Sequence, residues 1–79
     1  MTTQQKKDGA AWSEMTGSQM VFTMRAMCNY GGNFAGAIGY AFQCADANNM
    51  HRLAAAFPDL IERYGPGSEP YKKEAGEQQ

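Results

Sequence analysis

The amino-acid sequence predicts a small all-α domain of three helices, with the last helix kinked at Pro58 and a mobile segment at each end. Three observations predict this fold. Apolar residues recur with a helical period, glycine and proline stand between the periodic stretches, and no stretch alternates with period two for long enough to make a strand. At 79 residues the chain makes one domain. A domain of this size buries only about 60% of the surface that its unfolded chain exposes.

The composition excludes several classes of protein. Hydrophobic residues make up 43% of the chain, charged residues 19%, and the net charge is -1 at pH 7. No apolar run approaches the ~18 residues of a membrane span. Residues 1–8 lead into no apolar stretch of the kind found in signal peptides. The composition therefore excludes a membrane protein, a secreted disulfide scaffold and a strongly basic nucleic-acid coat.

The charges divide the chain into three parts. Residues 1–9 and 66–79 are polar, charged and rich in Gly and Pro. Such segments bury too little apolar surface to offset the entropy lost on ordering, so we predict a flexible N-terminal arm and a flexible C-terminal tail. Residues 10–65 hold nearly all the hydrophobic residues and form the predicted helical domain.

The first predicted helix covers residues 18–30 and ends at Gly31-Gly32, a pair that favours termination. Met20, Met24 and Met27 fall at i, i+4 and i+7. Helical Met spacing fits an ordinary core, but Met-rich faces also repack around varied partners. Both interpretations stay open at this point. The preceding residues, 10–17, are expected to form a short turn or helix that docks Trp12 on the bundle.

The second predicted helix covers residues 33–45, with Asn33 as its cap. Its apolar stripe follows the helical period at every position: Phe34, Ala37, Ile38, Ala41, Phe42 and Ala45. Small or uncharged residues gather on the side opposite Phe34: Gly32, Gly36, Gly39 and Gln43. This stripe lets another backbone approach closely, inside the bundle or across a subunit boundary. We therefore predict a helix that is sandwiched on both faces.

The third predicted helix covers residues 47–64, capped by Asp46 or Asn48 and stopped by Gly65-Pro66-Gly67. Its apolar stripe consists of Leu53, Phe57, Leu60, Ile61 and Tyr64. Pro58 conflicts with a continuous helix because it lacks an N–H group and clashes with the preceding turn. The stripe nevertheless continues across it. We expect a kink or a short restart near Phe57, with both halves facing one core.

The composition of the core predicts a domain that is only marginally stable without a binding partner. The chain has only five branched aliphatic residues, Val21, Ile38, Leu53, Leu60 and Ile61. Met specifies packing weakly, and Ala contributes little buried area. A core of this kind supplies only about 3–5 kcal/mol on its own. Self-association or a partner protein would add to it, and we expect a homo-oligomer.

No residue pattern in the sequence names a reaction. Cys28 and Cys44 lie on neighbouring predicted helices with an axial offset of about 12 Å, too far for a disulfide. His51 is the single histidine and cannot complete a zinc site with two thiols. A Cys–His nucleophile pair would also need a third group to orient it. We therefore expect no catalytic residues, no metal and no cofactor.

Nucleic-acid binding is the alternative function. The second and third predicted helices resemble a helix-turn-helix in outline, and the recognition helix would carry His51 and Arg52. Phosphate contacts dominate the affinity of such proteins, yet residues 10–65 contain three cations and four anions. Nucleic acid is therefore the less favoured partner.

A resemblance adds a biological setting. Residues 32–64 contain Gly32-Asn33-Phe34, then Ala45-Asp46, and later Ala56-Phe57-Pro58-Asp59-Leu60 before Tyr64. This stretch resembles small uncharacterised helical proteins of bacteriophages and prophages. The resemblance implies the cytoplasm of a bacterial host. Accessory phage proteins of this size act by binding and disabling a host protein, including a host defence protein.

The leading hypothesis is therefore a non-enzymatic phage or prophage accessory protein that acts by protein–protein binding. Its partners would be a host protein and further copies of itself. The predicted interface consists of four residues of the second helix and two of the third. They are Gly36, Gly39, Tyr40 and Gln43, followed by His51 and Arg52.

Overall fold

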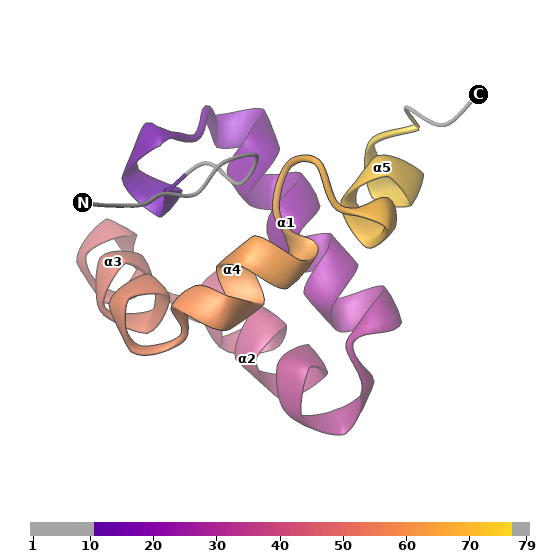
Figure 1. Cartoon of the computed structure of the whole chain (residues 1–79). Coiled ribbons are helices and arrows are strands. Elements are labelled where there is room, and N and C mark those ends of the chain that lie inside the picture. Colours follow the sequence, from indigo (N-terminus) through magenta and orange to yellow (C-terminus); the bar gives the residue numbers. More distant parts are fainter. Residues whose placement is uncertain (1–10, 77–79) are drawn as a thin grey trace, which may run out of the picture.

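The computed structural model describes residues 11–76, which fold into helices with no strand in that range. The predicted all-α class is confirmed, but the predicted count of three helices is wrong. The predicted N-terminal arm, residues 1–9, lies outside the described residues. The elements, shown in Figure 1, are the 3-10 helix η1 (Trp12–Glu14) and the α-helices α1 (Gly17–Tyr30), α2 (Gly32–Cys44), α3 (Ala47–Ala56), α4 (Pro58–Tyr64) and α5 (Glu69–Ala75).

The first two helices follow the boundaries that the sequence predicts to within about a residue. A capping box opens α1: the Gln19 N–H donates to Thr16 Oγ1 at 3.1 Å, and the Thr16 N–H donates to Gln19 Oε1 at 2.9 Å. Gly32, at φ +76°, turns the chain from α1 into α2. The prediction that Asn33 caps α2 is wrong, because Asn33 lies within the helix and no side chain caps its start.

The predicted kinked helix is two helices. Phe57, at φ −130° and ψ 59°, ends α3 and precedes Pro58, the first residue of α4. The physical reason is that a residue before proline avoids helical angles, and a proline at the first helical position loses no hydrogen bond. The backbone therefore leaves the helical conformation at Phe57 and begins a new helix at Pro58, as the alternative of a short restart predicts. Asp46 caps α3 by accepting from the Asn49 N–H at 2.9 Å, which settles the choice between Asp46 and Asn48.

The prediction that residues 66–79 form a flexible tail is wrong for Glu69–Ala75, which form α5. Ser68 caps this helix, and Gly76 ends it in the left-handed conformation at φ 73°. Tyr71 is buried and meets Phe22 of α1 edge to face, with ring centroids 5.9 Å apart. These tertiary contacts order a segment whose composition alone predicts mobility. The last residues, 77–79, lie outside the described range.

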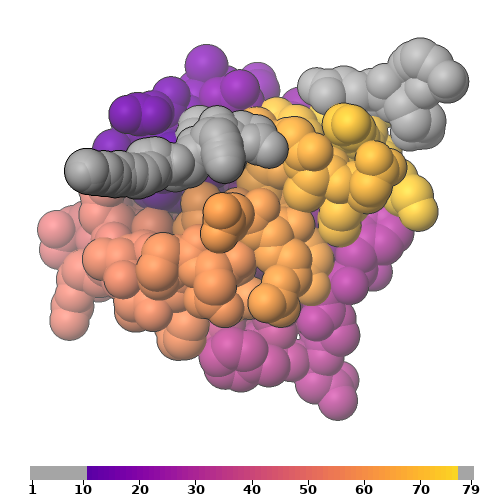
Figure 2. Space-filling view, in the orientation of Figure 1, coloured from indigo at the N-terminus to yellow at the C-terminus, as the bar shows by residue number. Residues whose placement is uncertain are grey.

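The core lies where α1, α2 and α4 meet η1, with α3 packed against its edge. The expected docking of Trp12 is confirmed: its ring is buried and lies 4.7 Å from that of Phe42, centroid to centroid. Met24 and Met27 are buried, so the Met stripe of α1 belongs to the core. Figure 2 shows one face of the molecule, largely covered by α3 and α4.

Candidate functional site

The second helix buries one side and exposes the other. Ala35, Gly39 and Phe42 are buried in the domain. The buried side lies between the apolar stripe and the stripe of small residues that the sequence predicts. Each stripe therefore contributes only one edge of the buried side. The predicted sandwich is therefore not formed within one chain, because one side of α2 faces solvent. We call that side the α2 outer face; it consists of Asn33, Ala37, Tyr40 and Cys44, all exposed.

Gly39 is the closest approach between α1 and α2. A Cβ atom placed on Gly39 would lie 2.8 Å from Met27 Cβ and 2.9 Å from Met24 O. At Gly36 the nearest atoms, Cys28 O and Met27 O, would both be 3.7 Å away, an ordinary contact. The glycine stripe thus serves close packing at Gly39, inside the chain. Gly36 retains space and is only half-buried.

The α2 outer face has one aromatic side chain, Tyr40, and no charge. No residue of α2 is Asp, Glu, Lys or Arg. Tyr40 is 65% exposed, and Phe34, on the flank of the face, is 60% exposed. A hydrogen bond with Cys44 raises the pKa of the Tyr40 hydroxyl, and the charge of Cys44 and desolvation raise it further. The Phe34 ring meets Phe57 edge to face at 5.6 Å, which orients it toward the α3–α4 junction.

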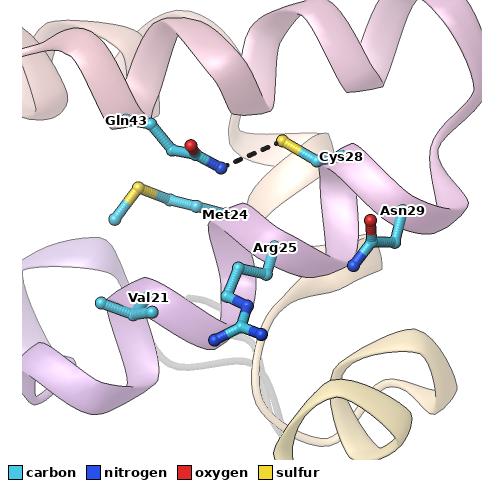
Figure 3. A pocket seen from close by; sticks show the side chains of 6 residues that line it. All are labelled: Val21, Met24, Arg25, Cys28, Asn29 and Gln43. Atoms are coloured by element: carbon cyan, nitrogen blue, oxygen red, sulfur yellow. Dashed lines mark hydrogen bonds between the residues drawn. The ribbon is translucent and has the colours of Figure 1, made fainter.

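A groove separates α1 from the α2 outer face. It has a volume of ≈ 540 Å³, and we call it the α1–α2 groove; Figure 3 shows its lining residues, Val21, Met24, Arg25, Cys28, Asn29 and Gln43. Gln43 reaches across from α2 and donates through Nε2 to Cys28 Sγ at 3.2 Å. Burial raises the pKa of the Cys28 thiol, and the negative charge of Glu74 raises it further. The lining of the groove therefore combines apolar side chains with thiol, amide and guanidinium groups.

A second groove lies on the other flank of α2. This α2–α3 groove is lined by Ala41, Cys44, Ala45, Asn49, Arg52 and Leu53. Arg52 donates through Nη1 to Asn49 Oδ1 at 3.0 Å. His51 is exposed but does not line either groove. The structure therefore brings Arg52 toward the α2 outer face and leaves His51 on another side of α3.

The six predicted interface residues thus fall into distinct places. Gln43 lines the α1–α2 groove, Tyr40 lies on the α2 outer face, Gly36 is half-buried and Gly39 is buried. The sequence reasoning missed Val21, which is 43% exposed and forms one wall of this groove. The signal was available: on a helical wheel Val21 lies outside the Met24 and Met27 side of α1.

Neither cysteine forms a disulfide, and Cys44 is exposed on the outer face. Within residues 11–76, no group of three or more His, Cys, Asp or Glu side chains is arranged to hold a metal ion. No helix in the same range is long and apolar enough to cross a membrane.

Comparison with known proteins finds no matching family model, no matching curated sequence and no matching solved structure.

Proposed function

We propose that this chain is a non-enzymatic phage or prophage accessory protein that acts by protein–protein binding through the α2 outer face. One observation carries the proposal: a helix of 13 residues without a charged side chain leaves Tyr40 65% exposed, with the exposed Ala37 and Cys44 one turn away on either side. Exposed apolar surface costs solubility, and where it is contiguous it marks sites of interaction. Tyr is also among the residues enriched at the centre of protein interfaces.

The resemblance of residues 32–64 to phage and prophage proteins supports a host protein as the target. A protein that occupies a surface of a host defence factor needs no chemistry of its own, only a complementary face. The described part of the chain fits that role, because Cys28 has Gln43 as its partner and His51 is exposed on another helix. The bacterial cytoplasm is the corresponding place of action.

Nucleic-acid regulation remains the alternative hypothesis, with α3 as the recognition helix. His51 and Arg52 are both exposed. As neighbours in an α-helix they project about 100° apart, so they do not form one basic strip. Salt-dependent binding to phosphates depends on several cations that face the same way. The geometry of α3 therefore favours the protein-binding hypothesis.

Affinity capture from a bacterial cytoplasmic extract tests the proposal. The bait is the full chain, a Tyr40→Arg variant, or an Ala55→Arg variant that adds the same charge at an exposed position of α3 away from the face. We expect the same host protein with the wild type and with Ala55→Arg, and its loss with Tyr40→Arg. Capture that is indifferent to Tyr40 would contradict the proposal, as would a mobility shift of random DNA at low salt.

A further inference from the structure

Two residues of α1 belong both to the α1–α2 groove and to the contact with α5. Arg25 and Asn29 line the groove. Both also hold the Glu74 carboxylate of α5: Asn29 Nδ2 donates to Glu74 Oε2 at 2.6 Å, and Arg25 Nε lies 3.4 Å from Glu74 Oε1. In Figure 3 the ends of these two side chains point to the side of α1 where α5 lies. Polar groups of the groove are therefore held by a helix that contributes no side chain to its lining.

The attachment of α5 to the domain depends on side-chain contacts with α1. Tyr71 is the one buried residue of α5, and its ring meets Phe22 edge to face at 5.9 Å. The Lys73 ammonium lies over the Tyr30 ring, 5.7 Å from its centroid. Figure 1 shows α5 at the edge of the molecule, beside α1. Because a helix of seven residues is not stable alone, α5 keeps its structure only while these contacts hold.

The connection between α4 and α5 allows α5 to move as a unit. It consists of residues 65–68 and contains Gly67 in the left-handed region, at φ 96°. Ser68 donates to the Gly65 carbonyl oxygen twice, through its N–H at 3.0 Å and through its hydroxyl at 2.8 Å. These bonds stay within the turn, so α5 can leave α1 without breaking them.

We propose that α5 is a detachable strap that controls the α1–α2 groove. While α5 is docked, Glu74 engages the Arg25 guanidinium and the Asn29 amide. When α5 lifts away, both groups become free to bind within the groove, and the side of α1 around Phe22 is uncovered. The groove and the strap are then coupled in both directions, because whatever draws Arg25 into the groove also loosens α5. This inference concerns α1 and α5 and goes beyond the proposed role of the α2 outer face.

The two cysteines make the state of the strap observable. Cys28 lines the groove together with Arg25 and Asn29. Burial raises the pKa of its thiol, and the negative charge of Glu74 raises that pKa further. Because the thiolate is the reactive form, departure of α5 should make Cys28 react faster at a fixed pH near neutrality. Cys44 is exposed on the α2 outer face and serves as the reference in the same chain.

Alkylation of both thiols by iodoacetamide in the full chain, followed for each cysteine by mass spectrometry, tests the inference. Tyr71→Ala removes the buried ring of α5 without changing the charge of the chain. We expect it to speed the alkylation of Cys28 by about 3-fold or more, because the fraction of thiolate and its accessibility both rise. The rate at Cys44 should stay the same.

A second pair of variants separates the docking contact from general charge effects. Glu74→Gln keeps an oxygen that accepts from Asn29 but loses the ion pair with Arg25, so it should also speed the reaction of Cys28. Glu69→Gln is the matched control, since it removes one negative charge from the same helix at an exposed pair with Lys72. It should leave both cysteine rates unchanged.

Hydrogen exchange in the same variants shows whether α5 has left α1. In Tyr71→Ala we expect the amides of α5 to lose protection while those of α2 keep it. An unchanged Cys28 rate in Tyr71→Ala would overturn the proposal, and so would acceleration in Glu74→Gln alone, which reduces Glu74 to a local charge. Equal acceleration of Cys28 and Cys44, or equal loss of protection in α5 and α2, would also overturn it, because α5 would then unfold only with the whole domain.

Discussion

Neighbouring helices α2 and α3 are held in the domain by different means. The α2 helix places Gly39 against the backbone of α1 and buries Phe42 completely. The α3 helix has no buried residue; Met50, Leu53 and Ala54 are only half-buried, and Asp46 caps its start. Close backbone packing holds the first, whereas a cap and partial burial hold the second.

This difference predicts which parts of the domain unfold together. The α1–α2 pair and the residues packed on it form one unit, so damage there should unfold the domain as a whole. Damage at α3 or α5 should act locally, because few fully buried groups connect these helices to the core. Three substitutions, each with a matched control, test this contrast between global and local effects.

The largest effect is expected for Gly39→Leu. Its Cβ would lie 2.8 Å from Met27 Cβ and 2.9 Å from a backbone oxygen, so the α1–α2 pair must separate. We expect a loss of about 3 kcal/mol or more in the free energy of unfolding, enough to unfold most of a domain this small. Gly36→Ala, where the nearest atoms are 3.7 Å away, should instead gain about 0.5–1 kcal/mol. Thermal melts followed by circular dichroism measure both. Equal melting temperatures for the wild type and Gly39→Leu would refute the close packing.

A smaller, local effect is expected for Glu74→Ala. The Glu74 carboxylate is 10% exposed and accepts from Asn29 Nδ2 at 2.6 Å, besides its ion pair with Arg25. Its loss should weaken the attachment of α5 by about 1–2 kcal/mol, a value lowered by the exposure of Arg25. Hydrogen exchange should speed up in α5 more than in α2. Glu69→Ala removes the exposed pair with Lys72 and should change little, so equal effects of the two variants would contradict this contact scheme.

The smallest effect is expected for Asp46→Ala, which removes the cap of α3. Loss of the bond from Asn49 N–H should cost about 1 kcal/mol and fray the first turn of α3. Asn48→Ala, two residues on and exposed, removes no capping bond and serves as the control. Amide exchange at the start of α3 measures the fraying. Fraying that spreads into α2 would mean that α3 belongs to the same cooperative unit.

The sequence predicts the helical class well because its signals are local. Thr16, Gly32, Asp46 and Gly65 stand at or beside helix boundaries, and each acts through its own backbone or a neighbour within a few residues. The helix α5 was missed although Ser68 and Gly76 bracket it. A helix of seven residues, four of them charged, gains too little from local bonds to form alone. Contacts with Phe22 and Asn29, far away in the sequence, decide the outcome.

The candidate site shows the same division. Tyr40, Gly36 and Gln43 could be selected from the sequence because they share one side of a helix. The helical wheel also places Val21 outside the buried Met side of α1, but its position in one groove with Gln43 depends on how α1 packs on α2.

By itself, the sequence determined that this chain is helical, where its first two helices begin and end, and that its branched aliphatic residues are few. Only the tertiary structure decided which side of α2 is buried. Two stripes of that helix, one apolar and one of small residues, were each able to face the core. The fit of Gly39 against the α1 backbone selected a side between them and left Tyr40 in solvent. Helical periodicity reports how residues align along one helix, whereas close packing depends on the shape of the helix beside it.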